Sequence, residues 1–284
     1  MITKNSYTRI TLALDIIGKI YNGPMKGYHE LGIIKHQITL CDSIEVKESR
    51  STKIECSDTA VPHDSSNICW KAVDLIKKRY GIDKNVTISI DKNIPVMGGL
   101  AGGSANAATM IDILNELWAL NFSKEEKKQL GRKLGMDVPF FFDGGTAFDT
   151  ETTGVLQKID TDLFATFVLV IPNFGVSTRD AYGGIDYSKV AKKTLQTSEM
   201  KSCISLNDMS KVVSLMHNDF ELSVFPRYPQ LQQIRDKMLE AGCLNAIMSG
   251  SGSTLIGIVR NRKEAMRVCN SLEYKSIITE TLKR

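Results

Sequence analysis

The sequence has few of the features that mark metal-binding, secreted or membrane proteins. Its six cysteines form no C-x-x-C pair, and none lies near one of the four histidines at the spacing of metal ligands. We therefore expect reduced thiols in a cytoplasmic protein, several of them buried. No stretch approaches the roughly 18 apolar residues that a membrane span requires, and the N-terminal segment has no signal-peptide cleavage site.

Strong charge of either sign is also absent. Lys and Arg number 36 against 32 Asp and Glu, which gives a net charge of +4 at pH 7. The basic residues form no run. The mild net charge suits an anionic small-molecule substrate and is too weak to indicate nucleic-acid binding. With 284 residues, 42% hydrophobic and 24% charged, the chain fits one large globular domain or two medium ones.

The most informative segment is glycine-rich and spans residues 93–117. A β-type run at residues 86–90 precedes it, and an amphipathic helix follows from about Ser104 to Trp118. Glycine permits close approach of the backbone, and a helix N-terminus offers unpaired N–H donors to a phosphate. The segment has neither the Walker A nor the Rossmann spacing, and most such turns bind nothing. Taken alone, it leaves a phosphate site and a plain turn both open.

Alternating strand-like and helix-like patterns predict an α+β fold in two lobes, residues 1–155 and residues 156–284. Cys41 and Asp42 are expected to form a turn between two strands. The expected strands are residues 7–17, 33–40, 43–48, 86–90, 166–171 and 254–259. The expected helices are residues 67–80, 104–118, one capped by Ser123 and Glu126, 211–222 and 228–241.

Three glycine-bearing segments occur in one order, PVMGGLAGGSANAA, GMDVPFFFDGGTAF and MSGSGSTLIGIV. Together they resemble the GHMP kinases, named for galactokinase, homoserine kinase, mevalonate kinase and phosphomevalonate kinase. The segments LALDIIGKI, GYHEL and HNDFELSVFPRYPQL are similar to the branch that phosphorylates a cytidine-diphosphate-linked polyol. This resemblance covers residues 7–259. It implies an N-terminal lobe like domain 2 of ribosomal protein S5, a ferredoxin-like α/β C-terminal lobe, and an ATP-dependent kinase that uses Mg²⁺.

The resemblance places the ATP phosphates on residues 95–104, where backbone N–H groups and the helix dipole supply donors. Ser104 would also reach Mg²⁺ or a phosphate oxygen. Adenine would lie near residues 66–68, although Asn67 fits a plain helix cap equally well. The residues assigned to ATP are Asn67, Pro95, Gly98, Gly99, Leu100, Ala101, Gly102, Gly103 and Ser104.

The same resemblance assigns the catalytic pair. Asp137, in LGMDVPF, would accept the proton of the acceptor hydroxyl as the new bond forms. Taken alone, it fits a turn aspartate with local hydrogen bonds. Arg9 stands where the family usually has lysine, and its charge would keep Asp137 ionised and offset charge that develops during transfer. A solvated strand residue is the alternative for Arg9.

The acceptor site follows from two further segments. Tyr28 would stack on cytosine, His29 would hydrogen-bond the base edge, and Tyr182 would close the sandwich. Thr178 lies near Tyr182, and Thr11 replaces an asparagine that contacts the acceptor. Ordinary packing is the alternative for both tyrosines, and a structural role is the alternative for His29. Residues 249–253 would support the glycine loop or the acceptor, with a simple tight turn as the alternative.

Several positions depart from the family pattern. Arg9 and Thr11 do so on the acceptor side, and Ala105 replaces a second serine after the glycines. The Gly-x-Gly-Glu that follows GGTAF in the family is absent at residues 149–154. These departures leave two alternatives, a GHMP kinase for a different small alcohol and a nucleotide-binding paralogue without catalysis. Monomer and homodimer both stay open.

Overall fold

Two long strands each contribute residues to both compact units of the chain. The computed structural model describes residues 1–190 and 195–283, and in it β1 is Ile2–Lys19 and β2 is His29–Ser49. Unit 1 contains residues 1–8, 40–96 and 101–144, and unit 2 contains residues 9–39, 97–100 and 145–284. The lobe boundary between residues 155 and 156 stays a prediction.

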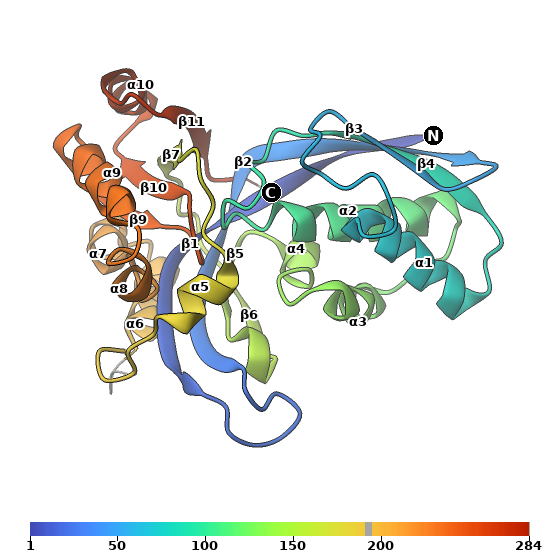
Figure 1. The fold of residues 1–284 in the computed structure, drawn as a ribbon, viewed down its shortest axis with the longest axis horizontal. Coiled ribbons are helices and arrows are strands. Elements are labelled where there is room, and N and C mark those ends of the chain that lie inside the picture. The colour runs from blue at the N-terminus through green and yellow to red at the C-terminus, as the bar shows by residue number, and fades with distance from the viewer. Residues whose placement is uncertain (191–194, 284) are drawn as a thin grey trace. The chain divides into compact units, whose positions relative to one another are not determined.

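Unit 1 packs helices against one face of a small sheet (Figure 1). β4 pairs antiparallel with β2 and parallel with β3. Val86, Ile88 and Ile90 alternate inward along β4, and with helix residues such as Ile111 they form the buried core. The remaining elements are β3 (Lys53–Cys56), α1 (Ile68–Tyr80), β4 (Asn85–Asp91), α2 (Gly102–Leu117), α3 (Lys124–Leu134) and α4 (Phe140–Asp143).

Unit 2 contains an antiparallel sheet in the order β11-β7-β10-β9, with α9 and α10 on one face (Figure 1). Beside it, β8 pairs with β1, β5 pairs with β2, and β6 pairs with β5. The strands are β5 (Thr146–Asp149), β6 (Leu156–Ile159), β7 (Thr166–Ile171), β8 (His217–Asn218), β9 (Asn245–Met248), β10 (Leu255–Val259) and β11 (Lys275–Glu280). The helices are the 3-10 turn η1 (Glu151–Thr153), α5 (Thr178–Gly183), α6 (Gln196–Ser205), α7 (Met209–Leu215), α8 (Glu221–Val224), α9 (Pro229–Glu240) and α10 (Arg262–Ser271).

The α+β prediction is confirmed, and so are most of the expected elements. Asn67 caps α1 by accepting from Cys69 N, and Gly81 ends the helix with φ of 64°. Ser123 and Glu126 form the predicted capping box at α3. Among the described residues, no helix combines the length and the apolar character needed to cross a bilayer.

Two expected elements are wrong. Cys41 and Asp42 form no turn, because β2 runs unbroken from His29 to Ser49. The expected helix at residues 211–222 divides into α7, β8 and α8. There, Ala13 and His217 are paired in a parallel β-ladder, and the side chain of Asn218 binds two backbone carbonyl groups of another segment. These tertiary hydrogen bonds outweigh the helical pattern.

Candidate functional site

The glycine-rich segment enters α2 earlier than expected. Gly102, Gly103 and Ser104 form the first turn of the helix instead of preceding it. Before them, Met97 and Ala101 have φ of 56° and 54°, left-handed values that are uncommon without glycine. No acidic residue lies in the first turn of α2. The unpaired N–H groups and the helix dipole therefore face no negative side chain of that turn, which suits an anion.

A buried carboxylate that the sequence did not indicate anchors this segment. Asp42 is fully buried, and its Oδ1 accepts from the backbone N–H groups of Asn93 and Ile94, both at 2.8 Å. Its Oδ2 accepts from Lys92 Nζ at 2.9 Å and from Asn106 Nδ2 at 3.0 Å. Asp42 thus ties the approach to the glycine loop to the second turn of α2.

A side chain at Gly102 would displace Ile94. A Cβ added to it would lie 2.8 Å from Ile94 Cγ2, closer than real contacts allow. The chain entering the loop therefore crosses directly over the start of α2.

The Asp137 turn lies next to the start of α2 within unit 1. A Cβ built on Gly135 would be 3.8 Å from Ser104 Oγ, so the residues just before Asp137 run beside that hydroxyl. The Asp137 carbonyl accepts from Phe140 N at 3.2 Å, which fixes the turn that leads into α4. Asp137 is half-buried, and Val138 and Phe140 beside it are buried. A carboxylate therefore stands on a rigid turn close to the helix N-terminus.

In unit 2, two side chains converge on the Gly99 carbonyl. Arg9 Nη1 donates to it at 2.9 Å, and Ser249 Oγ donates to it at 3.0 Å. Gly99 has φ of 71°, and a Cβ there would lie 2.1 Å from the Ser249 carbonyl oxygen. Arg9 also donates to Thr11 Oγ1 at 3.4 Å, and both side chains are buried. The structure thus brings Arg9, Thr11, Gly99 and the turn at residues 249–253 together.

The turn at residues 249–253 has its own support. Asn218 Nδ2 donates to the carbonyl groups of Met248 and Gly250, both at 2.7 Å. Thr254 N donates to the Gly98 carbonyl at 3.3 Å. The turn therefore holds residues 98 and 99 of the glycine loop, and the sequence did not reveal the part of Asn218 in this.

An aromatic group forms around His29 at the start of β2. The His29 ring lies 4.4 Å from the Tyr182 ring, and it is parallel to the Tyr187 ring at 6.1 Å, centroid to centroid. Burial and the charge of Lys19 lower the pKa of His29, so the ring is neutral near pH 7. Tyr187 was not predicted from the sequence. Its only signal there was that it is an aromatic residue shortly after Tyr182. Tyr182 thus packs on His29.

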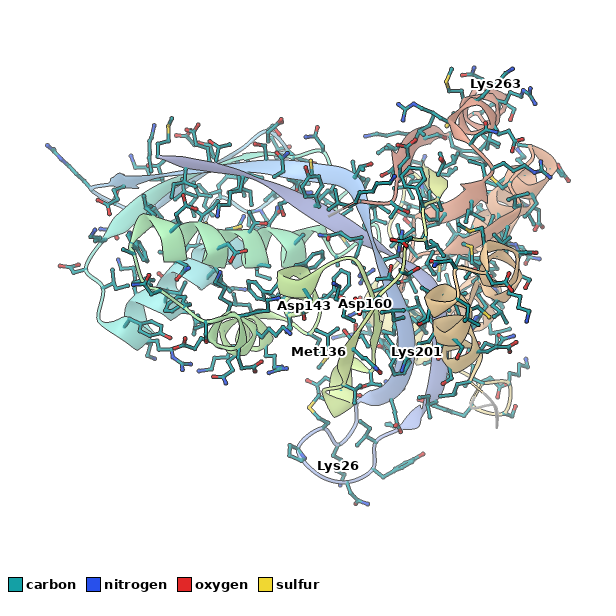
Figure 2. The ribbon with its side chains drawn as sticks, turned by 180° about the vertical axis from the view of Figure 1, so that it is seen from behind. Lys26, Met136, Asp143, Asp160, Lys201 and Lys263 are labelled. Atoms are coloured by element: carbon teal, nitrogen blue, oxygen red, sulfur yellow. The ribbon has the colours of Figure 1, made fainter. Side chains whose placement is uncertain are left out.

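Tyr28 and Thr178 stand at the edges of this region. Tyr28 is half exposed in the loop between β1 and β2, whose position Lys26 marks in Figure 2. Its ring makes no aromatic contact among the described residues. Thr178 begins α5, and its hydroxyl lies 3.4 Å from Ser251 Oγ. Asn67 caps α1, and its Nδ2 donates to the Pro62 carbonyl at 2.7 Å.

Two family models and several named relatives match this chain. The family model for the GHMP kinases N terminal domain matches residues 67–145, and that for GHMP kinases C terminal matches residues 200–276. The 4-diphosphocytidyl-2-C-methyl-D-erythritol kinase of Alkaliphilus oremlandii is 40% identical over 95% of this chain and 92% of that protein. The enzyme of that name from Gloeobacter violaceus is 35% identical over 92% of this chain and 86% of that protein.

The chain belongs to the GHMP kinases, in the family of the 4-diphosphocytidyl-2-C-methyl-D-erythritol kinases. Solved structures agree on the fold. A crystal structure of 4-(cytidine 5'-diphospho)-2C-methyl-D-erythritol kinase superposes with a TM-score of 0.82 at 23% identity, over 99% of this chain and all of that one. Homoserine kinase from Cytophaga hutchinsonii gives 0.70 at 15% identity, over 97% of this chain and 94% of that one.

Outside these segments, the GHMP kinase has a buried cluster of Asp15, His217 and Asp219, spaced closely enough to hold a cation. Hydrogen bonds already use several of the atoms of this cluster that could bind a cation. The His217 ring nitrogens lie 2.9 Å from the Leu215 carbonyl and 2.9 Å from Asp15 Oδ1, and both can be satisfied only when both nitrogens carry a proton. Asp219 Oδ2 accepts from Ile16 N at 2.9 Å. The cluster therefore links β1 to β8 as a hydrogen-bonded network.

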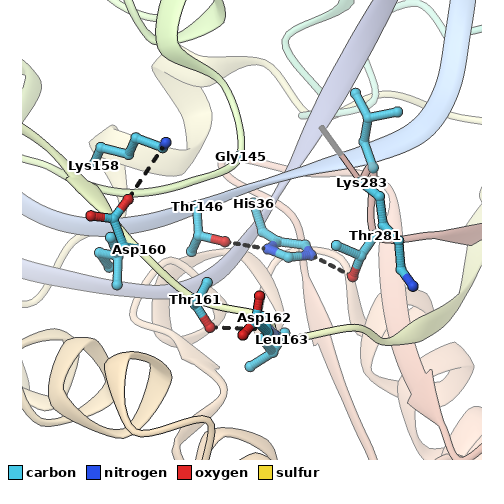
Figure 3. Close-up of a pocket in the computed structure, with 12 residues that line it drawn as sticks. His36, Gly145, Thr146, Lys158, Asp160, Thr161, Asp162, Leu163, Thr281 and Lys283 are labelled. Carbon is cyan, nitrogen blue, oxygen red and sulfur yellow. Dashed lines mark hydrogen bonds and ion pairs between the residues drawn. The ribbon is translucent and has the colours of Figure 1, made fainter.

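A polar cavity of about 350 Å³ lies in unit 2 of the GHMP kinase (Figure 3). In it, His36 lies between two hydroxyl groups, Thr146 Oγ1 at 2.8 Å from Nδ1 and Thr281 Oγ1 at 2.9 Å from Nε2. Burial lowers the pKa of His36 to about 4, so it is neutral. None of the predicted site residues lines this cavity.

Proposed function

We propose that this chain transfers the γ-phosphoryl group of ATP to the 2-hydroxyl of 4-diphosphocytidyl-2-C-methyl-D-erythritol, a step of non-mevalonate isoprenoid biosynthesis. The relatives that match nearly the whole chain carry the name of this substrate. The observation that carries the proposal is the His29–Tyr182 ring pair of unit 2. Tyr182 lies in α5, and Thr178 at the start of α5 lies 3.4 Å from Ser251 in the turn at residues 249–253. A neutral imidazole and aromatic faces suit a pyrimidine base.

The transfer assigns each group a task. The acceptor oxygen forms a bond to the γ-phosphorus, the bond from that phosphorus to the β-bridging oxygen breaks, and Asp137 takes the hydroxyl proton. The N–H groups of residues 98–104 bind the phosphates, and Asn67 and Pro95 border the nucleotide. Arg9 holds the loop and supplies positive charge, while Thr11 and Thr178 contact the acceptor. Tyr28, His29 and Tyr182 bind cytosine.

Mg²⁺ fits the start of α2. Ser104 Oγ would hold it there, with phosphate oxygens and water as the other ligands, the hard oxygen donors this ion prefers. When bound, the ion neutralises charge on the β- and γ-phosphates. A cytoplasmic location likewise stays a prediction from the cysteine pattern.

The direct test is ADP release by the purified protein with ATP and Mg²⁺. The cytidyl substrate is compared with homoserine and mevalonate as alternative acceptors. We expect turnover on the cytidyl substrate alone. Turnover only on another alcohol would establish the second candidate, a GHMP kinase with a different acceptor, which Arg9 and Thr11 favour because both stand on the acceptor side. ATP binding without turnover on any acceptor would leave the nucleotide-binding paralogue.

A further inference from the structure

A fully buried lysine lies in β2, six residues after His29. Lys35 Nζ is 2.7 Å from Asp149 Oδ2 and 3.0 Å from Glu151 Oε1, and its side chain has no exposed surface. Both carboxylates are largely buried as well. Burying such a group is a poor way to gain stability, because desolvation offsets the Coulomb attraction. Fixing the position of neighbouring residues therefore explains such a cluster better than a gain in stability does.

The cluster holds an unusual turn. Asp149 Oδ1 accepts from the backbone N–H of Glu151 at 2.6 Å, while its Oδ2 binds Lys35. Glu151 has φ of 51°, in the left-handed region that residues with a Cβ rarely adopt. The turn covers residues 149–154, where the sequence departs from the Gly-x-Gly-Glu of the family. Lys35 and its two carboxylates thus fix a strained backbone in the divergent segment.

This turn reaches the aromatic group directly. Thr152, next to Glu151 in η1, donates its hydroxyl to the His29 carbonyl at 3.0 Å. His29 begins β2, and its ring packs on Tyr182. A continuous series of contacts therefore runs from Lys35 through Asp149 and Glu151 to Thr152 and the backbone of His29.

We propose that Lys35, Asp149 and Glu151 form a positioning cluster for recognition of the cytosine base. By fixing the turn, they place the Thr152 hydroxyl on the His29 carbonyl and so set the His29 ring against Tyr182. None of the three touches the reacting atoms in this scheme. The inference rests on the proposed function for the identity of the base, but the placement of the His29 ring does not depend on it.

The mildest test is T152V, which removes one hydroxyl at nearly constant shape. Its matched control is T39V, at another threonine of unit 2, which removes a hydroxyl bound to Thr279 Oγ1 at 3.0 Å. We expect T152V to weaken CDP binding and raise KM for the cytidyl substrate about fivefold, the loss of roughly one hydrogen bond. KM for ATP should not change, and T39V should change neither constant.

K35M removes the cation and leaves two buried carboxylates, so we expect a larger loss of CDP affinity than in T152V, about tenfold or more. The triple variant K35M/D149L/E151Q removes the buried charges altogether and covers the case in which K35M does not fold. It should be stable yet still bind CDP weakly, because the D149L change removes the oxygen that accepts from the backbone N–H of residue 151. Recovery of full CDP affinity by the triple variant would overturn the proposal.

An NMR measurement tests the placement without any substrate. The Tyr182 ring should shift the His29 Hε1 resonance upfield, and T152V should move that resonance toward its unstacked position while T39V leaves it in place. An unmoved His29 resonance in T152V would overturn the inference, and so would equal losses of CDP and ATP affinity. If the wild-type protein binds no CDP but T152V still moves the His29 resonance, the proposed function fails and the positioning cluster stands.

Discussion

At the scale of single residues, hydrogen bonds to the backbone determine much of the candidate site. Arg9 was expected as a cation beside the reaction, and it also clamps the Gly99 carbonyl together with Ser249. An arginine fork offers several donors, and one of them holds the loop. The side chain therefore links the Gly99 carbonyl to Thr11, the residue proposed to contact the acceptor.

Asp137→Asn tests the catalytic base. The amide keeps the shape of the turn but cannot take a proton, so turnover should fall by about 10²–10⁴. ATP affinity should stay within about twofold, because ground-state binding does not use the proton transfer. Turnover is measured by ADP release, and affinity by calorimetry.

The matched control for D137N is D143N. Asp143 lies in the same unit and forms ion pairs with Lys124 and Lys128, outside the proposed chemistry. If D143N loses as much turnover as D137N, the assignment of Asp137 as base is wrong.

At the scale of elements, the sequence predicted best where local signals act alone. α1 with its Asn67 cap, α3 with its capping box and the apolar β7 depend on their own residues. β2 was divided in error because Asp42 resembles a turn residue, while its side chain instead binds Asn93 and Ile94 from a segment about fifty residues away.

The candidate site shows the same division. The glycine loop and Asp137 could be proposed from motifs, because phosphate binding favours glycine and proton transfer favours a carboxylate. Asn218 and Tyr187 could not, because their significance comes from partners distant in the chain or in another element. A residue such as Asn218, whose side chain donates to backbone carbonyl groups, belongs to no recurrent sequence motif.

Gly99→Ala should disable the glycine loop. The new Cβ would meet the Ser249 carbonyl at 2.1 Å, and the φ of 71° is unfavourable for alanine. A left-handed residue other than glycine costs about 1–3 kcal/mol, so we expect KM for ATP to rise about tenfold. G18A is the control, because Gly18 in β1 has no atom within 4 Å of an added Cβ. Equal kinetics in the two variants would contradict a close-packed loop.

The link between β1 and β8 should make stability depend on pH. Burial lowers the pKa of His217, but hydrogen bonds to Asp15 and the Leu215 carbonyl outweigh it, and the net pKa is raised above 6.5. The protonated ring therefore stabilises the fold fully below pH 6.5, and this contribution is lost as the pH rises through the folded pKa. We expect Tm to fall as the pH rises above 6.5.

His217→Asn should reduce that fall in Tm, whereas H63N, at an exposed position, should keep it. The pKa of Asp15 is lowered, since its hydrogen bonds to His217 and Thr197 outweigh desolvation. Its contribution is present above pH 3.8 and disappears only on further acidification, so it does not interfere above pH 6.5. An unchanged slope in H217N would show that another group titrates.

At the scale of the whole molecule, the two compact units do not follow one another along the chain. Unit 2 includes residues 9–39 as well as residues 145–284. Leu14, Ile16 and Leu31 belong to the same buried cluster as Val168 and Leu255. A strand early in the sequence is therefore part of the core that the C-terminal half needs.

This interleaving predicts how fragments behave. A fragment of residues 156–284 lacks β1, which pairs with β8 through Ala13 and His217, and lacks the apolar residues that β1 and β2 contribute to the core. Exposed core surface of this kind opposes independent folding. We expect no cooperative thermal transition for the isolated fragment by circular dichroism, whereas co-expression with residues 1–155 should restore a folded complex. Cooperative unfolding of residues 156–284 alone would instead show that the predicted boundary separates two autonomous domains.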